Sequence, residues 1–182
     1  MNFNKFKHWN ELTPAQILVT GYFTIIITGT ILLMLPVATM DNNGLNLVNA
    51  LFTSTSATCV TGLIVVNTSA AFTIFGKTVI MILIQIGGLG IMTMSTMIAF
   101  VLGKKISLKE RLIIQEDLNQ FKISGVVRLV RYVLGLTFII EGTGALLLFI
   151  RLIREYSFWK AVYFSVFLAV SAFNNAGFDF FG

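Results

Sequence analysis

Three long apolar stretches of the chain predict membrane-spanning helices. Residues 12–40 and 78–103 carry no charge, and residues 132–150 carry only that of Glu141. A helix needs about 20 predominantly apolar residues to cross the hydrocarbon core of a bilayer. We therefore predict spans over residues 13–38, 78–103 and 128–153.

Local signals bound the first span. Thr13 is a candidate cap of the first turn, Pro14 suits the first helical position, and Gln16 has the spacing to bond back to the cap. Pro36 and then the Asp-Asn-Asn-Gly sequence at 41–44 are expected to end it. The stretch is longer than the apolar region of a signal peptide and has no convincing small-residue cleavage site. We therefore expect a retained span.

Two shorter segments combine a short helix with a polar, glycine-containing loop. Residues 45–57 are compatible with a helix of about 20 Å at 1.5 Å per residue, which is shorter than a hydrocarbon core of about 30 Å. Residues 58–63 follow with hydroxyl groups and a glycine. A helix over 158–172 and a loop over 173–178 form the second such pair. Because non-helical backbone at membrane depth must be buried in protein or line an aqueous cavity, we predict re-entrant loops.

The two halves of the chain resemble each other at a fixed offset of 115 residues, the difference between Ser171 and Ser56. The Ser-Ala-x4-Gly pattern at 56–62 recurs at 171–177, and the same shift superposes the first and third spans. Self-similarity at one fixed period is the signature of a repeat, which we favour over a chance match. The fold class expected is an all-α integral membrane protein of span, pore helix, filter loop and span units. Residues 13–103 would form one complete repeat and residues 128–182 a truncated second.

The composition agrees with a membrane protein. Hydrophobic residues make up 56% of the chain and charged residues 12%, whereas about a quarter of a soluble domain is charged. The net charge of +5 would suit nucleic acid, but no basic stripe or nucleic-acid motif is present, so nucleic-acid binding is not expected. The single cysteine, Cys59, excludes an intrachain disulfide, and the single histidine, His8, has no partner ligand nearby. No metal site is expected beyond that of a transported ion.

Basic residues favour one orientation in the membrane. Nine of the 13 Lys and Arg residues lie in the tail 1–12, in the loop 104–127 or at the start of the third span. The other four, at the opposite ends of the spans, are Lys77, Arg151, Arg154 and Lys160. Because cytoplasmic loops carry the excess of Lys and Arg, we predict a cytoplasmic N-terminus and filter loops that enter from outside. The capping-box pattern at Ser107 predicts an amphipathic surface helix that reaches about Phe121.

The predicted loops have the chemistry of an ion-selectivity filter. In such filters backbone carbonyl oxygens replace the hydration shell of the ion, and glycines such as Gly62 and Gly177 allow backbone conformations that disfavour a Cβ. Neither loop contains an acidic residue, so binding of a divalent cation by carboxylates is not expected. A weak carbonyl site suits a large monovalent cation such as potassium. The loops alone leave the choice among monovalent cations open.

Two features within the spans have alternative interpretations. A charged group at mid-bilayer costs about 2.5–3.5 kcal/mol on insertion scales, so Glu141 is expected to face the protein interior or a cavity. It is either a pathway or gating group or, as we favour, a buried carboxyl that is paired with a neighbouring helix or protonated. The glycines at 87–90 follow no strand, so close helix packing is favoured over a phosphate-binding loop.

Three segments resemble the Trk/Ktr potassium-uptake family, and the bacterial Ktr membrane subunit in particular. They are residues 53–63, 85–93 and 171–178, in the order expected for the family. The resemblance implies potassium translocation, in a bacterial plasma membrane, through a pore of four covalently joined repeats. It also implies the filter-lining residues, with Gly62 and Gly177 as the filter glycines. These residues are Thr58, Cys59, Val60, Thr61 and Gly62 in the first loop, and Asn174, Asn175, Ala176, Gly177 and Phe178 in the second.

The same resemblance implies partners. Family members form homodimers of membrane subunits, which dock on a cytoplasmic ring of nucleotide-binding regulatory subunits. Sodium is implied as an activator of uptake, and no covalently bound cofactor is expected. Because the family carries four repeats, residues 1–182 are expected to be the N-terminal part of such a subunit.

Three alternative functions are weighed against potassium transport. A secondary transporter also has repeats and broken helices, but the repeats predicted here share one orientation. A membrane-embedded enzyme would need converging reactive groups. Glu141 is the only acidic or basic side chain in residues 12–40, 78–103 and 132–150, and Cys59 is the only thiol, so an enzyme is not expected. A non-transporting remnant or scaffold is the remaining alternative.

Overall fold

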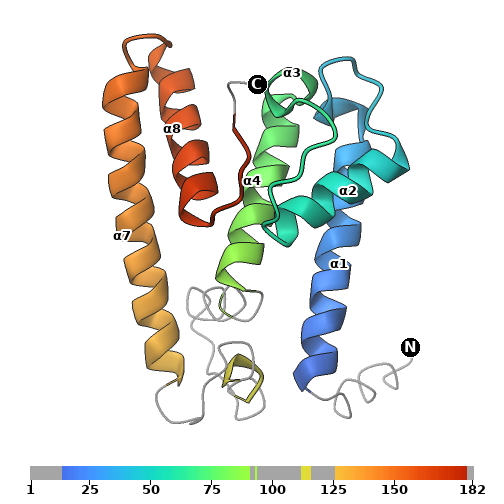
Figure 1. The fold of residues 1–182 in the computed structure, drawn as a ribbon, viewed down its shortest axis with the longest axis vertical. Coiled ribbons are helices and arrows are strands. Elements are labelled where there is room, and N and C mark those ends of the chain that lie inside the picture. Colours follow the sequence, from blue (N-terminus) through green and yellow to red (C-terminus); the bar gives the residue numbers. More distant parts are fainter. Residues whose placement is uncertain (1–13, 91–92, 94–111, 116–125, 180–182) are drawn as a thin grey trace, which may run out of the picture.

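The computed structural model describes residues 14–90, 93, 112–115 and 126–179. Within these ranges the chain is helical and contains no strand, only an isolated antiparallel bridge between Thr39 and Phe72. The helices, drawn in Figure 1, are α1 (Pro14–Met34), α2 (Leu47–Thr58), α3 (Thr68–Ala71), α4 (Ile74–Leu89), α7 (Val126–Leu152) and α8 (Phe158–Phe173), with a 3-10 turn, η3 (Pro36–Ala38).

Helices α1 and α7 are long and apolar enough to cross a membrane. Their candidate spans, Ala15–Met34 and Val127–Leu152, each have a mean hydropathy of 2.1. Only 17% of the most apolar window of each helix is buried, so large side chains such as Phe23 and Leu147 point away from the protein. A buried core helix of a soluble protein would hide these groups from water. The described part of the chain is therefore helical, and its two long helices have the length and the exposed apolar surface of membrane spans.

Proline ends the first helix earlier than expected. The predicted span ran to residue 38, but α1 ends at Met34 and Pro36 opens η3. Residues 41–44 form the expected turn, with positive φ angles at Asn42 and Gly44. Hydrogen bonds from the Thr39 hydroxyl and the Asn43 amide lower the pKa of Asp41 in this turn. The expected cap at Thr13 lies outside the described residues.

The two short helices are arranged alike. Helix α2 packs against α1 and α8 packs against α7. Helices α2 and α8 begin near the end of the molecule where α1 and α7 finish, and each stops partway along its long partner. After each short helix the chain returns toward the end where that helix began (Figure 1). The helices were predicted over 45–57 and 158–172, and the structure shifts the first by two residues at its start because Asn46 caps it by accepting a hydrogen bond from the Asn49 amide.

Helix α4 lies between the two pairs and differs from the prediction. The expected span over 78–103 begins at Ile74, capped by Thr73, and α4 ends at Leu89, where Gly90 has a φ of 83°. Lys77, expected to precede the span, is buried within the first turn and donates a hydrogen bond to the Ser69 carbonyl (2.8 Å). Most of residues 91–103 lie outside the described residues. Of the predicted surface helix in the loop 104–127, only residues 112–115 are described, and they are helical.

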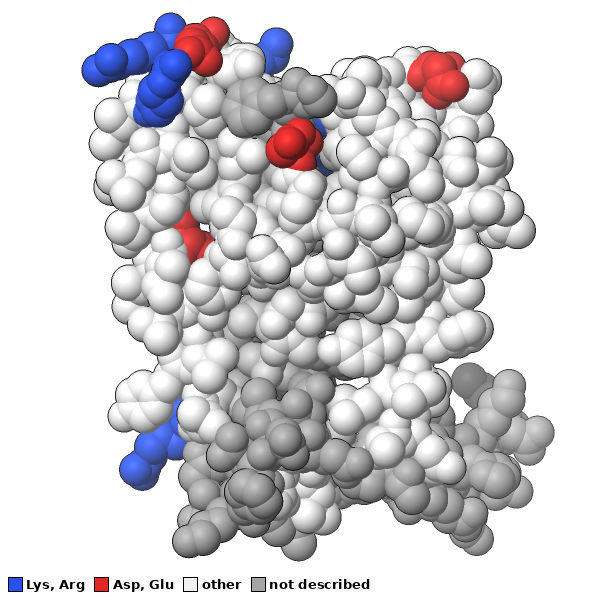
Figure 2. Space-filling model, in the orientation of Figure 1, with Lys and Arg blue, Asp and Glu red and all other residues white. Residues whose placement is uncertain are grey.

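Helix α4 also joins the two halves of the protein. It contacts α1, α2 and α8, and its Ile80 and Ile84 are fully buried in a core that includes Leu33 of α1 and Phe167 of α8. On the face drawn in Figure 2, Lys and Arg lie mainly at the two ends of the long axis, and a broad band between them is almost free of charge. This band is the surface expected to face the hydrocarbon of the membrane.

Candidate functional site

The loops that follow α2 and α8 have the same backbone hydrogen bonds. In the first loop, the Cys59 amide donates to the Thr55 carbonyl (2.8 Å) and the Thr61 amide donates to the Ser56 carbonyl (3.0 Å). At an offset of 115 residues, the Asn174 amide donates to Val170 (3.1 Å) and the Ala176 amide donates to Ser171 (2.7 Å). The two halves therefore end their short helices in the same turn.

A serine hydroxyl fixes the far end of each loop. Ser56 Oγ donates to the carbonyl of Leu63 (2.7 Å), and Ser171 Oγ donates to the carbonyl of Phe178 (2.6 Å). Both serines are buried in the last turns of their helices. Each bond joins a helix to a residue seven positions later, so it closes the loop onto the helix that precedes it.

Each loop also has two residues in the left-handed region of the backbone. These are Val60 (φ 56°) and Gly62 (φ 73°) in the first loop, and Asn175 (φ 57°) and Gly177 (φ 71°) in the second. Glycine adopts this conformation freely, and asparagine adopts it more readily than most residues. A β-branched valine is a genuine outlier there. Such strain costs of order 1–3 kcal/mol and is concentrated at functional sites.

The two loops meet at their glycines. A Cβ built on Gly177 would lie 3.1 Å from the Cα of Gly62, and one built on Gly62 would lie 3.0 Å from the carbonyl oxygen of Ala176. A side chain at either position would be strained by the positive φ, and it would also require the facing loop to move by a few tenths of an ångström. The structure therefore brings together two predicted loops that are 115 residues apart in sequence.

The predicted filter residues differ in where their side chains lie. Ala176 and Phe178 are buried, and Phe178 belongs to the central core. Cys59, Thr61 and Asn175 are exposed. The side chains of Val60 and Asn174 are half-buried. Thr58 was expected in the loop but is the last residue of α2, and its buried hydroxyl has no hydrogen-bond partner among the described residues.

The last turn of α4 packs through glycine against the end of α2 and the start of the second loop. A Cβ on Gly87 would lie 1.9 Å from the Thr58 carbonyl oxygen, and a Cβ on Gly88 would lie 1.9 Å from Asn174 Oδ1. Close packing was the predicted use of these glycines, and the structure bears it out with the loops as the packing partners.

Glu141 is the buried acidic side chain behind the second loop. Its Oε2 accepts a hydrogen bond from Gln85 Nε2 (3.2 Å) and its Oε1 accepts one from Asn174 Nδ2 (3.4 Å). Asn174 Nδ2 also donates to Gln85 Oε1 (3.3 Å). The carboxyl is thus paired with neighbouring elements, the interpretation favoured from the sequence. The sequence does not identify Gln85 as the partner of Glu141, although a lone amide in an apolar span is a signal of buried pairing.

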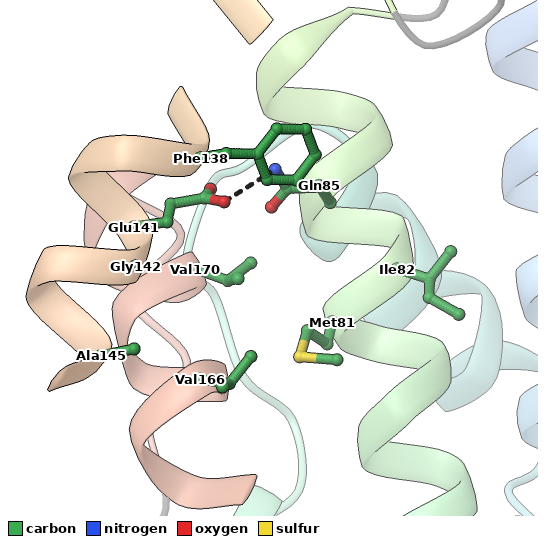
Figure 3. Close-up of a pocket in the computed structure, with 9 residues that line it drawn as sticks. All are labelled: Met81, Ile82, Gln85, Phe138, Glu141, Gly142, Ala145, Val166 and Val170. Atoms are coloured by element: carbon green, nitrogen blue, oxygen red, sulfur yellow. Dashed lines mark hydrogen bonds between the residues drawn. The ribbon is translucent and has the colours of Figure 1, made fainter. Parts of the chain in front are cut away.

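A pocket of about 340 Å³ adjoins this cluster between α4, α7 and α8 (Figure 3). Its walls are mostly apolar, with Met81, Phe138 and Val166 among them, and Gln85 and Glu141 lie together at one end. Gln85 and Glu141 thus form the polar part of the pocket wall. Both side chains already accept hydrogen bonds from Asn174.

Removal of the loop-closing serine hydroxyl should destabilise the protein. In Ser171→Ala the carbonyl of Phe178 loses its hydrogen bond, and an unsatisfied buried acceptor costs about 1–3 kcal/mol. We expect a lower melting temperature of the detergent-purified protein. Ser165→Ala is the matched control, because the buried Ser165 hydroxyl donates only to the Ala161 carbonyl within α8 (2.6 Å). Equal melting temperatures of the two variants would contradict the prediction.

These features define a helical membrane protein with two matching glycine loops set against each other. The TrkH family of cation transport proteins matches residues 4–182, so the chain belongs to the TrkH cation transport family. It is 51% identical over 176 residues to the Ktr system potassium uptake protein B of Bacillus subtilis. The aligned region covers 97% of this chain and 39% of that protein.

Two further relatives agree. The potassium/sodium uptake protein NtpJ of Enterococcus hirae is 40% identical over 182 residues, 100% of this chain and 40% of that protein. The Ktr system potassium uptake protein B of Vibrio alginolyticus is 37% identical over 166 residues, 91% of this chain and 36% of that protein. The chain thus spans about two fifths of the length of these relatives.

Proposed function

We propose that residues 1–182 form the N-terminal part of a potassium-uptake subunit and supply two of the four loops of its selectivity filter. The observation that carries the proposal is the pairing of the loops, which share hydrogen bonds and positive φ angles at an offset of 115 residues and meet at Gly62 and Gly177. The names of the relatives support potassium as the transported ion. Sodium, in the name of the Enterococcus relative, is a candidate activator or second cargo.

The paired loops have the physical properties that a filter needs. An ion sheds its water only where several backbone carbonyls converge on one axis, so the loops must approach one another without side chains between them. The absence of a Cβ at Gly62 and Gly177 permits this approach. The hydrogen bonds from Ser56 and Ser171 hold each loop on its helix. Two more loops, from the part of the subunit beyond these residues, would complete the ring.

The proposed topology follows from the direction of the helices. Helices α1 and α7 run the same way, and both loops return to the end where these helices finish (Figure 1). With the N-terminus in the cytoplasm, as the basic residues favour, both filter loops enter from the outside of the plasma membrane. The subunit would be a multi-pass protein.

Partners are part of the proposal. The name of two relatives, "Ktr system", describes a multi-component system. We propose a homodimer of membrane subunits bound to a cytoplasmic ring of nucleotide-binding regulatory subunits. The loop 104–127, with its basic residues, would lie on the same side of the membrane as this ring.

Rubidium uptake tests the proposal. Residues 1–182 are joined to the remainder of the Bacillus subtilis relative and expressed in bacteria that lack their own potassium uptake. We expect growth at low potassium and uptake of radioactive rubidium that excess potassium inhibits. A folded protein in the membrane that supports neither growth nor uptake would contradict the proposed function.

A further inference from the structure

Asn174 holds a central place behind the second loop. It is the C-cap of α8, and its side-chain amide donates to the Val170 carbonyl in the last turn of that helix (2.9 Å). Its Oδ1 lies against Gly88 of α4, where any Cβ would overlap it. The next residue, Asn175, has a positive φ and begins the approach to Gly177. The position of Asn174 therefore decides where the second loop leaves its helix.

Two side chains from other helices converge on this amide. Glu141 reaches it from α7 and Gln85 reaches it from α4, and the two are also bonded to each other (Figure 3). Gln85 and Glu141 are 56 residues apart in sequence, and they come from different halves of the protein. The hydrogen bonds among Gln85, Glu141 and Asn174 thus connect the two halves of the protein, and Asn174 is the first residue after α8.

A carboxylate is the group that this bridge requires at position 141. Gln85 and Asn174 both present N–H donors to it, one to each oxygen. A carboxylate accepts on both oxygens, whereas a glutamine amide accepts on one and donates on the other. Glutamine can therefore preserve only one of the two bonds, and leucine preserves neither.

We propose that Glu141 is a positioning residue for ion selectivity: with Gln85 it clamps Asn174 and so fixes the second loop relative to α4 and to the first loop. Glu141 acts through Asn174 and does not contact the ion. This inference rests on the proposed filter function of the loops, and it adds a residue that holds the filter from behind.

The first test is a graded series at position 141 in the completed subunit, measured by the ability of sodium to compete with rubidium uptake. We expect Glu141→Leu to reduce the preference for rubidium over sodium about tenfold, because the loss of both hydrogen bonds releases Asn174 and lets the spacing of the second loop change. Glu141→Gln should lie between the parent protein and the leucine variant. If Glu141 were a pathway charge, both variants would lose the charge and reduce the rate equally.

Glu155→Gln is the matched control. Glu155 lies beyond the end of α7 in an exposed pair with Arg151 (2.6 Å), so this variant makes the same chemical change away from both loops. We expect the selectivity of Glu155→Gln to equal that of the parent protein.

A purely structural role of Glu141 would lower the amount of protein and the uptake of both ions together. Unchanged selectivity in Glu141→Leu, or equal effects of leucine and glutamine, would overturn the proposal.

A double-mutant cycle tests the clamp without transport. Melting temperatures are compared for Glu141→Leu, Asn174→Ala and the double variant in detergent, because side chains in one hydrogen-bond network give non-additive effects. We expect the double variant to melt well above the temperature that the sum of the two single shifts would give. Additive shifts would refute the clamp even if uptake is normal, whereas absence of uptake by the parent protein would refute the proposed function alone.

Discussion

Replacement of Gly177 by aspartate is expected to abolish rubidium uptake while the protein remains in the membrane. The residue has a φ of 71°, which L side chains rarely adopt, and a Cβ there would meet the Cα of Gly62 at 3.1 Å. The new side chain would push the two loops apart and place a carboxylate where both loops lack one. A fixed charge would bind a cation tightly, whereas conduction needs binding weak enough for release.

Gly177→Ala and Gly135→Ala make this prediction quantitative. The alanine at 177 adds the strain without the charge, so uptake should fall strongly but less completely than with aspartate. Gly135 lies in α7, where an added Cβ would meet nothing within 4 Å, so alanine there should leave uptake at the parent level. Gly62→Asp should repeat the result of Gly177→Asp, because the two glycines meet each other. Normal uptake in both aspartate variants would remove these loops from the pathway.

The sequence predicted the helical elements because their signals are local. Length and the absence of charge mark α1 and α7, and a serine, a polar segment and a glycine mark the loop after each short helix. The fixed offset also predicts that the two loops are alike. In the structure, Ser56 and Ser171 make corresponding hydrogen bonds to Leu63 and Phe178. These features need only the order of residues along the chain.

The structure departs from the sequence prediction at three positions, and two of them depend on a partner in another element. The sequence predicts Lys77 as a charge that precedes the membrane span, but its long apolar stem allows burial while its Nζ reaches the Ser69 carbonyl. The sequence predicts Gly90 within a continuous span over residues 78–103, but its positive φ ends α4. The partners of Glu141 could not be named, because Gln85 and Asn174 are brought to it by tertiary packing.

The arrangement around α4 links these observations. One turn of this helix presents Gly87 to the end of α2 and Gly88 to Asn174, and Gln85 on the same helix bonds to Glu141. The end of α4 is therefore a common support for both loops, and the spacing between the loops depends on how closely each approaches this helix. Small side chains at this end of α4 are a geometric requirement of the site.

Replacement of Gly87 by alanine should therefore disturb the site even though it adds a single methyl group. A Cβ at this position would lie 1.9 Å from the Thr58 carbonyl oxygen and 2.7 Å from its carbonyl carbon. Both atoms are backbone, so the end of α2 must move away from α4. Overpacking of this kind costs about 1–3 kcal/mol, and it would shift the first loop away from the second.

We expect Gly87→Ala to lower the melting temperature and to reduce rubidium uptake more than it reduces the amount of folded protein. Gly135→Ala is again the matched control, since the same methyl group added at an open helical position meets no atom within 4 Å and favours the helix by up to about 1 kcal/mol. Gly88→Ala should reduce uptake as Gly87→Ala does, but its melting temperature should fall less. The Asn174 side chain beside Gly88 can rotate away from a new methyl group, whereas the Thr58 carbonyl beside Gly87 belongs to the backbone. If Gly87→Ala and Gly135→Ala had the same stability and uptake, α4 could not be the support of the first loop.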